Sequence, residues 1–291
     1  MAKDTFFQKK VTLNAGGKLI DLSTPKVMGI INVTPDSFFA GSRKTNVSDA
    51  VFMAEKMLND GADLLDIGAY SSRPGATDIS PQEETDRLLP VIEVIVKRFP
   101  EAVLSVDTFR ASVAEVAVNA GAQIINDISG GDLDAQMFKT VAKLQVPYIL
   151  MHMKGTPQNM QEKAQYEDVF AEVFDYFAEK VYRLKQLHVH DVVLDPGFGF
   201  AKTREQSFEL LQQMQGFDLL DLPLLVGISR KGMIYKTLNG TAETALNGTT
   251  VLNTIALMNG ASVLRVHDVK EAVEAVELFM AYQGEKPEFI I

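Results

Sequence analysis

The stretches DGADLLDI (residues 60–67), AGAQIIND (residues 120–127) and NGASVLRV (residues 259–266) share the pattern that decides the fold. In each of them a glycine is followed by mostly apolar residues over the length of a strand. Glycine can take the left-handed conformation that ends a helix, and a run of apolar residues is typical of a strand buried on both faces of a parallel sheet. The three stretches therefore indicate a repeated unit in which a helix ends and a buried strand begins.

Apolar runs of strand length recur outward from this repeat along the chain. There are eight of them: residues 27–31, 64–67, 103–106, 123–125, 147–151, 192–194, 224–228 and 262–266. Ser80 is expected to start one of the intervening helices, with Glu83 completing a capping box. Further expected helix starts are Thr108, Thr203 and Asp268. Strands that alternate with helices form parallel sheets, and eight such units close into a barrel. The sequence predicts an α/β protein with a single (β/α)8 TIM barrel.

The N-terminal part of the chain departs from this alternation. Residues 11–22, VTLNAGGKLIDL, are interpreted as a short N-terminal β-hairpin that closes the bottom of the barrel. No linker rich in proline, serine or glycine divides the rest of the sequence. We therefore expect one domain overall, with residues 1–26 as the hairpin and residues 27–291 as the barrel.

Composition excludes several classes of function. The chain has 38 acidic and 28 basic residues, a net charge of -10, whereas nucleic-acid binding depends on clustered lysine and arginine. It has no cysteine, and therefore neither disulfides nor thiolate metal sites. No apolar run reaches the length of a signal peptide core or a membrane span. We expect a cytoplasmic protein that acts on small molecules and binds neither nucleic acid nor a membrane.

Polar residues follow or end almost every predicted strand. They are Asn32, Asp66, Asp107, Asn126, Asp127, His152, Asp195, Ser229, Arg265 and His267. One such residue alone often caps the next helix or binds loop backbone. In a parallel barrel, however, the strand ends meet at one rim, where the active sites of this fold lie. Their convergence predicts an active site at that rim.

Two motifs give this predicted site a chemistry. DPGFGFAKT, residues 195–203, joins a carboxylate to glycines that allow a planar ligand to approach the backbone, and it lacks the spacing of a glycine-rich phosphate loop. SRKGM, residues 229–233, follows the seventh strand, close to where barrels often bind phosphate. Arg265 and His267 alternate on the eighth strand, so both side chains can grip one anion, and their spacing suits a diphosphate. Arg43, Lys44 and Arg73, in two long polar loops, can attract an anionic substrate.

Eight segments, read in order, resemble the signature of the dihydropteroate synthase family. They are NVTPDSF, SSRPG, SVDT, INDISGG, LMHMKG, DPGFGF, SRK and RVHDV, and they span essentially the whole chain. The resemblance implies a transferase of folate biosynthesis. This enzyme would condense 6-hydroxymethyl-7,8-dihydropterin diphosphate with 4-aminobenzoate, with Mg2+ as cofactor, to give 7,8-dihydropteroate and diphosphate. It also implies a homodimer and a target of sulfonamides.

The resemblance also implies the roles of individual residues. The pterin-binding residues are Asp107, Asn126, Ile128, Met151, Asp195, Gly199 and Lys231. The diphosphate-binding residues are Asn32, which also contacts the metal, Ser72, Arg265 and His267. The residues near the aminobenzoate are Phe38, Arg73, Pro74, Phe200 and Lys231. Catalysis would rest on Asp107, Asp195, Lys231, Arg265 and His267. Carboxylates and an amide oxygen suit the N–H donors of a dihydropterin, and Lys231 suits its 4-oxo group.

The chain departs from the family pattern around the second substrate. Ala40 stands in place of a frequent aspartate, and Gly232 stands where a serine that can hold the aminobenzoate carboxylate is common. Residues 68–72 read GAYSS where the family commonly has GGEST, and Ser72 keeps the hydroxyl. Two alternatives therefore stay open: a methyltetrahydrofolate-type pterin methyltransferase and a non-catalytic pterin-binding protein. The retained Arg265 and His267 pair argues against both, because neither needs to hold a diphosphate.

Overall fold

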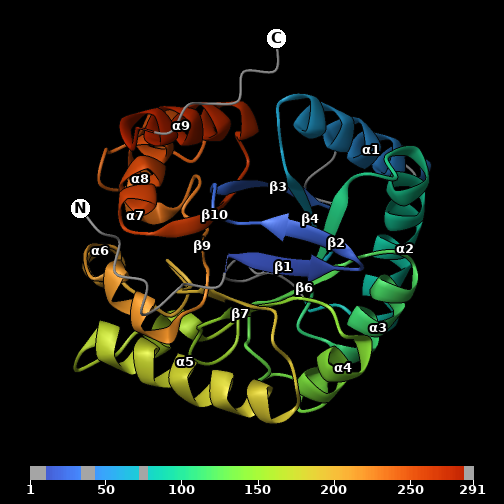
Figure 1. The fold of residues 1–291 in the computed structure, drawn as a ribbon, viewed down its shortest axis with the longest axis horizontal. Coiled ribbons are helices and arrows are strands. Elements are labelled where there is room, and N and C mark those ends of the chain that lie inside the picture. The colour runs from blue at the N-terminus through green and yellow to red at the C-terminus, as the bar shows by residue number, and fades with distance from the viewer. Residues whose placement is uncertain (1–10, 34–42, 72–77, 285–291) are drawn as a thin grey trace.

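The computed structural model describes residues 11–33, 43–71 and 78–284, without the side chains of residues 43–46. Eight parallel strands form a closed barrel, in the order β10-β3-β4-β5-β6-β7-β8-β9 (Figure 1). Their bounds are β3 (Lys26–Asn32), β4 (Leu64–Gly68), β5 (Val103–Asp107), β6 (Ile124–Asp127), β7 (Tyr148–Met151), β8 (Val192–Asp195), β9 (Leu224–Val226) and β10 (Ala261–Val266). The predicted barrel is therefore confirmed, although β9 is shorter than expected and several strands include the polar residue that follows the apolar run.

Helices surround the barrel (Figure 1). Those described are α1 (Arg43–Asn59), α2 (Pro81–Arg98), α3 (Ala111–Asn119), α4 (Met137–Leu144), α5 (Val169–Gln186), α6 (Arg204–Gln212), α7 (Gly232–Tyr235), α8 (Leu246–Met258) and α9 (Val269–Tyr282), with the 3-10 helices η2 (Met160–Lys163) and η3 (Met214–Leu220). Buried apolar side chains on the outer faces of the strands pack against these helices in one large core. No helix in the described ranges is long and apolar enough to span a membrane.

Two predicted helix starts are confirmed by their hydrogen bonds. Ser80 Oγ accepts from the Glu83 backbone N–H at 3.1 Å, although the Glu83 carboxylate pairs with Arg87 and does not complete a capping box. Thr203 and Gln206 form a full capping box at the start of α6. A side chain that accepts from the first turn satisfies a backbone donor that the helix itself leaves unpaired.

Of the other two predicted helix starts, Thr108 is wrong, whereas Asp268 is confirmed in position but makes no cap hydrogen bond. Helix α3 begins at Ala111, after Arg110, and Thr108 Oγ1 only accepts from the Arg110 backbone N–H, at 3.2 Å, outside the helix. Asp268 stands at the start of α9 but makes no cap hydrogen bond, because its carboxylate binds the Arg230 guanidinium at 3.0 and 2.5 Å. The Asp268 carboxylate thus forms an ion pair with Arg230, in the loop after β9, in place of a cap hydrogen bond to α9.

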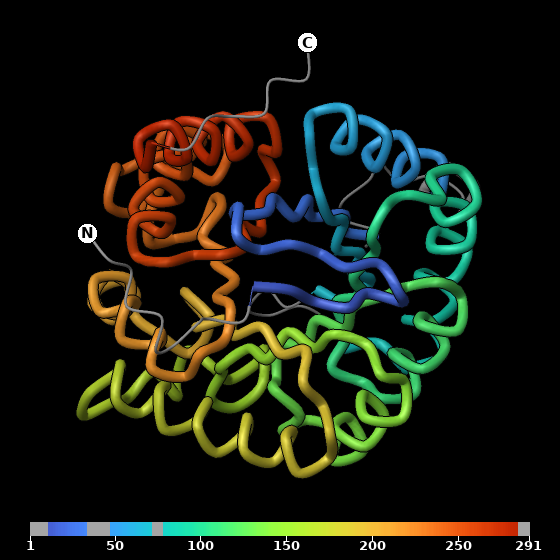
Figure 2. The backbone as a smooth tube through the Cα atoms, in the orientation of Figure 1, coloured from blue at the N-terminus to red at the C-terminus, as the bar shows by residue number. Residues whose placement is uncertain are grey.

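The bottom of the barrel is filled by one apolar layer. Each strand contributes one residue to it: Met28, Leu64, Val103, Ile124, Ile149, Val193, Leu225 and Val263. The N-terminal hairpin, β1 (Thr12–Ala15) and β2 (Lys18–Asp21), adds Leu13, Ala15, Ile20 and Leu22 to the same cluster. It crosses the barrel in Figure 2 and turns at Gly16 and Gly17, which both have positive φ. The hairpin therefore packs against the bottom layer of the barrel.

The barrel interior changes from apolar to polar toward the carboxyl ends of the strands. Side chains alternate along a strand, so the residue two positions after each bottom-layer residue also points inward. On six strands these residues are Asp66, Ser105, Asn126, Met151, Asp195 and Arg265. Asp66 and Ser105 are fully buried. A polar layer at this depth places charged groups directly beneath the rim.

Candidate active site

A cluster of charged residues occupies the centre of the polar layer. The Arg265 guanidinium donates from Nε to Asp66 Oδ2 at 2.6 Å and from a terminal nitrogen to Asp107 Oδ2 at 2.7 Å. Asn126 Nδ2 donates to the same Asp66 oxygen at 3.0 Å. Strands β4, β5, β6 and β10 thus each place one side chain in this cluster. The sequence pointed to Asp66 as one of the rim residues but gave it no role, whereas the structure makes it the common partner of Arg265 and Asn126.

Burial controls the charges of this cluster. It raises the pKa of Asp107 to about 7, although Arg265 opposes that shift, and the neighbouring carboxylate of Asp66 adds to it. Burial disfavours the charged form of Arg265 as well, but Asp66 and Asp107 outweigh it and raise the pKa of the guanidinium. Arg265 is therefore always cationic, whereas Asp107 exchanges its proton near neutral pH.

Replacing Asp107 with asparagine is expected to change how the free energy of unfolding depends on pH. The folded protein binds a proton at Asp107 below about pH 7, whereas an unfolded aspartate does so only below its ordinary value of 3.8. Stability of the parent therefore falls as pH rises from 4 to 7. The asparagine side chain carries no such proton, so the variant should gain on the order of 2 kcal/mol relative to the parent over this range. Urea unfolding at pH 5 and pH 8 measures the gain, and identical pH dependence in both proteins would contradict it.

Lys231, which follows β9, forms another part of the site. Its ammonium group donates to the Phe198 carbonyl at 2.7 Å and lies 4.6 Å from the centre of the Phe200 ring. Its aliphatic stem passes beside Gly199, where a Cβ would lie 3.6 Å from Cδ of the lysine. Burial lowers the pKa of Lys231 to about 8, with Asp195 opposing this shift and Arg265 adding to it. The lysine is a cation at neutral pH that loses its proton in mildly alkaline solution.

Asp195 and an apolar surface complete the described part of the site near Lys231. Asp195 is buried, and its Oδ1 accepts from the Gly197 backbone N–H at 2.8 Å. Burial raises the pKa of Asp195, and Lys231 opposes this most strongly. Ile128 and Met151 belong to one apolar cluster that Phe200 borders. Such a surface can bind the face of a planar ring while the carboxylates accept from its edge.

His267 follows β10 on the same side as Arg265. Its Nδ1 lies 3.1 Å from Ser229 Oγ, and its backbone N–H donates to that oxygen at 3.2 Å. Burial, and then Arg265 and Arg230, lower the pKa of His267 to about 4. The imidazole is therefore neutral at pH 7, and its role toward an anion is that of a hydrogen-bond donor. Arg230, grouped with Lys231 in the sequence motif, instead binds Asp268.

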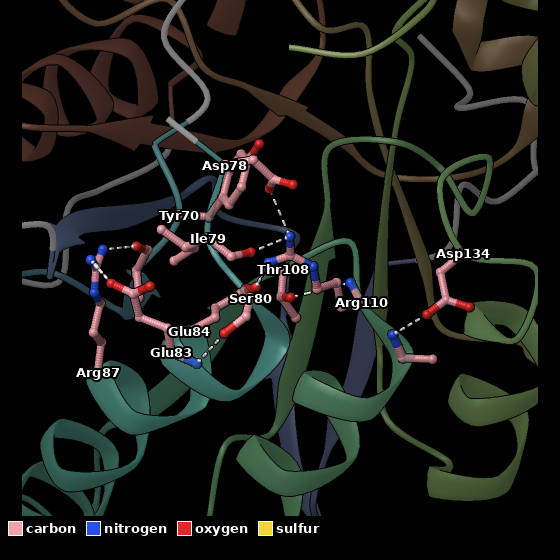
Figure 3. Close-up of polar contacts among 12 residues, drawn as sticks. Tyr70, Asp78, Ile79, Ser80, Glu83, Glu84, Arg87, Thr108, Arg110 and Asp134 are labelled. Carbon is pink, nitrogen blue, oxygen red and sulfur yellow. Dashed lines mark hydrogen bonds and ion pairs between the residues drawn. The ribbon is translucent and has the colours of Figure 1, made fainter. Parts of the chain in front are cut away.

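Two arginines hold the ends of the long loop between β4 and α2, residues 69–80. Figure 3 shows Arg110 reaching toward the end of this loop, where it donates to the Asp78 carboxylate at 2.9 Å and to the Ile79 carbonyl at 2.7 Å. Its guanidinium also pairs with the buried carboxylate of Glu84 on α2. At the beginning of the loop, Arg87 donates to the Ala69 carbonyl at 3.3 Å. The beginning of this loop is thus fixed to α2, and its end is fixed to the segment between β5 and α3.

The remaining predicted residues divide into two groups. Asn32 ends β3 with a half-buried side chain, and Gly232 begins α7, where a Cβ would meet the Tyr235 hydroxyl only at an ordinary 3.5 Å. Phe38, Ala40, Ser72, Arg73 and Pro74 lie outside the described residues, as do the side chains of Arg43 and Lys44. The described site therefore contains the residues predicted for the pterin and most of those predicted for the diphosphate.

His152 needs a correction, because it does not open toward the rim. It is almost fully buried, and its Nδ1 lies 2.8 Å from the ammonium group of Lys202. Burial, and then Lys202, lower the pKa of His152 well below its ordinary value. Lys202 itself is buried and was not among the predicted site residues, although it stands within the DPGFGFAKT motif.

Comparisons with known proteins identify the family of this chain. The model of the pterin binding enzyme family matches residues 28–267. The dihydropteroate synthase of Escherichia coli K12 is 46% identical over 275 residues, which cover 92% of this chain and 95% of that protein. The dihydropteroate synthase of Haemophilus influenzae is 36% identical over 271 residues, which cover 92% and 98%.

Solved structures agree as well. A Xanthomonas albilineans dihydropteroate synthase with 4-aminobenzoic acid has a TM-score of 0.88 at 38% identity and covers 94% of this chain and 98% of its own. A Yersinia pestis dihydropteroate synthase in a sulfonamide drug complex has a TM-score of 0.88 at 42% identity, and covers 94% and 99%. With this similarity over nearly its whole length, the chain belongs to the pterin binding enzymes and, within them, to the dihydropteroate synthase family.

Proposed function

We propose that this protein transfers the pterinylmethyl group of 6-hydroxymethyl-7,8-dihydropterin diphosphate to 4-aminobenzoate, giving 7,8-dihydropteroate and diphosphate in folate biosynthesis. The observation that carries this proposal is the polar layer at the rim, where buried carboxylates lie close to the cations of Arg265 and Lys231. The relatives named as dihydropteroate synthases support it, as does a solved relative in complex with 7,8-dihydropteroate.

In this proposal the pterin lies between the carboxylates and Lys231. Asp107, Asn126 and Asp195 accept hydrogen bonds from its ring N–H and amino groups, and Lys231 donates to its 4-oxo group. Ile128, Met151 and Gly199 line the faces of the ring. Each of these residues is buried or half-buried at the rim. A ligand that replaces water with matched partners can be held tightly there, because a low dielectric strengthens each hydrogen bond.

The diphosphate would lie against Arg265 and His267, with Asn32 and Ser72 as further partners. Arg265 is already bound to two carboxylates. It can stabilise the additional negative charge that develops on the leaving oxygen without any movement of protein groups, which is the arrangement that lowers a barrier most. Neutral His267 contributes a hydrogen bond and not a second charge.

The oxygen donors at the rim bear on the proposed binding of Mg2+. Among the described residues no group of three acidic or histidine side chains is arranged to hold a metal. Asn32 supplies a neutral amide oxygen at the end of β3, which fits an Mg2+ that is held mainly by diphosphate oxygens and water. When bound, Mg2+ would neutralise charge on the departing diphosphate.

The 4-aminobenzoate would approach from the side of Phe200 and Lys231, with Phe38, Arg73 and Pro74 as further contacts. The Phe200 ring next to the Lys231 ammonium offers an apolar face and a cation to an aromatic carboxylate. A cation near the carboxylate orients the aniline nitrogen toward the pterin methylene group.

For the chemical step we propose early departure of diphosphate. The bond between the pterin methylene carbon and the diphosphate oxygen breaks, its electrons stay on that oxygen, and the buried carboxylates stabilise the cation that is left. The neutral aniline nitrogen then forms the new C–N bond and loses one proton. No general base is needed, because the attacking lone pair is already free. Labelled diphosphate should therefore exchange into the substrate without aminobenzoate; no exchange and no trapped cation would favour concerted displacement.

A substrate comparison distinguishes the proposed function from the methyltransferase alternative. The purified protein is incubated either with pterin diphosphate, Mg2+ and 4-aminobenzoate or with 5-methyltetrahydrofolate and a corrinoid acceptor. We expect product only in the first mixture. Methyl transfer to the corrinoid in the second would overturn the proposal.

We also propose a homodimer through helices α8 and α9. Val251, Ile255 and Met258 form an exposed apolar stripe on α8, and Leu278 and Tyr282 are exposed on the neighbouring α9. Residues spaced by four and three positions share one helix face, and apolar faces of this kind are typical of protein interfaces. The proposal therefore gives the stripe a second copy of the chain as its partner.

Replacing Ile255 with glutamate is expected to convert the dimer to a monomer, because a charge would be buried in the interface without a partner. Light scattering coupled to gel filtration measures the mass. Tyr182→Glu, at an exposed aromatic residue on α5, is the matched control and should stay dimeric. A monomeric parent, or an Ile255→Glu variant that stays dimeric, would contradict the proposed interface.

The cytoplasmic location and the division into residues 1–26 and 27–291 are part of the same proposal. The absence of cysteine suits a reducing compartment. The hairpin contributes to the barrel core, which supports one folding unit.

A further inference from the structure

The segment between β8 and α6 is held by side chains at every one of five successive carbonyl oxygens. Lys202 Nζ donates to the carbonyls of Gly197 and Phe200, both at 3.2 Å, and Lys231 Nζ donates to that of Phe198. The remaining two carbonyls accept from more distant side chains: Gln161 Nε2 to Gly199 at 3.1 Å and the Tyr166 hydroxyl to Ala201 at 2.8 Å. This segment is therefore fixed by side chains and not by regular secondary structure.

The backbone of this segment is one that needs such support. Gly197, Gly199 and Ala201 all have positive φ, and for alanine this conformation is strained. A Cβ at Gly197 would lie 2.1 Å from the His152 carbonyl oxygen, so only glycine fits there. The Lys202 ammonium group also lies close to His152: 3.4 Å from its carbonyl oxygen and 2.8 Å from its Nδ1.

Hydrogen-bond acceptors surround the buried ammonium group of Lys202. They are His152 Nδ1 and the carbonyls of His152, Gly197 and Phe200. It is 3% exposed, so it does not reach a ligand. Burial lowers the pKa of Lys202 well below its ordinary value, and Asp195 opposes this.

We propose that Lys202 is a positioning residue for pterin binding, which holds the backbone of residues 197–201 in place. It acts through the Gly197 N–H, which donates to Asp195, and through the Phe198 carbonyl, which sets the position of Lys231. The inference rests on the proposed function, since it assigns Asp195, Gly199 and Lys231 to the pterin.

Lys202→Met tests this role, because methionine keeps an unbranched side chain but removes the charge and all three donors. The measurement is the Kd of the pterin diphosphate substrate with Mg2+ and without aminobenzoate, together with Tm. We expect the Kd to rise at least 20-fold.

Lys180→Met is the matched control. Lys180 on α5 is 4% exposed, pairs with Asp132 and makes no hydrogen bond to residues 197–201 in the described part of the chain. This variant should lose a comparable amount of Tm while the Kd stays within twofold. A Kd within threefold of the parent for Lys202→Met, whatever its Tm, would overturn the positioning role.

Lys202→Arg keeps the charge but not the compact arrangement of donors. Its Kd for the pterin diphosphate is expected to be at least fivefold higher than that of the parent, but lower than that of Lys202→Met. If Lys202→Met does not fold, Lys202→Arg decides: parent-like affinity at a lowered Tm would overturn the role. The parent is measured first, and its failure to bind the pterin diphosphate would count against the proposed function and not against Lys202 alone.

Discussion

Replacing Arg265 with methionine is expected to lower kcat/KM by about 1000-fold, the effect of removing one group that stabilises charge developing on a leaving oxygen. Arg265 links the proposed pterin site to the proposed diphosphate site. It binds Asp66 and Asp107 in the resting protein, and it is the cation proposed for the departing diphosphate. Its loss removes the charge stabilisation and leaves two buried carboxylates without their partner.

The same variant should be destabilised in a pH-dependent way. An uncompensated buried charge costs roughly 3 kcal/mol, but a carboxylate can avoid that cost by taking up a proton. The loss of Tm should therefore be larger at pH 8 than at pH 5.5. Initial rates and thermal unfolding are measured on the same samples, with Arg265→Lys as the control that keeps a positive charge. Full activity in Arg265→Met would show that the diphosphate is bound elsewhere.

Replacing Lys231 with methionine is expected to have the second largest effect, with kcat/KM reduced on the order of 100-fold or more. Lys231 is the one residue proposed to contact both substrates, and its ammonium is fixed by the Phe198 carbonyl beside the Phe200 ring. Its absence removes the donor for the pterin 4-oxo group and the cation for the aminobenzoate carboxylate. The KM for both substrates should rise.

The pH profile adds an independent measurement for Lys231. Since burial lowers the pKa of Lys231 to about 8, the parent should lose activity as pH rises through that value and the lysine loses its proton. The alkaline limb of the profile should be absent from the residual activity of Lys231→Met. Lys236→Met, at an exposed lysine after α7, is the matched control and should keep the parent profile. An unchanged alkaline limb in Lys231→Met would assign it to another group.

The barrel was predictable from the sequence because its signal is local and repeated. A glycine at a helix end, an apolar strand and a polar residue at the strand end all lie within one short stretch, as at residues 60–67. Parallel strands then bring those polar residues together whatever the details of packing. The hairpin was predictable for the same reason, because residues 14–17 contain the turn.

What the sequence could not give is the choice of partner among several charged groups. Asp268 had the position of a helix cap, but a guanidinium from the neighbouring strand loop, Arg230, offers its carboxylate a stronger bond. His152 had the position of a rim residue, but Lys202 lies 50 residues further along the chain and binds it inside the protein. Such pairs depend on tertiary distances, and no local pattern encodes them.

The central claim is that the rim joins a pterin diphosphate to an aromatic amine, and product formation by the purified protein tests it most directly. The protein is mixed with 6-hydroxymethyl-7,8-dihydropterin diphosphate, 4-aminobenzoate and Mg2+, and dihydropteroate and diphosphate are measured over many turnovers. We predict that both products form in a one-to-one ratio, and that dihydropteroate formation stops when aminobenzoate is left out. Tight binding of the pterin diphosphate with no dihydropteroate formed would contradict the claim and identify a pterin-binding protein without this activity.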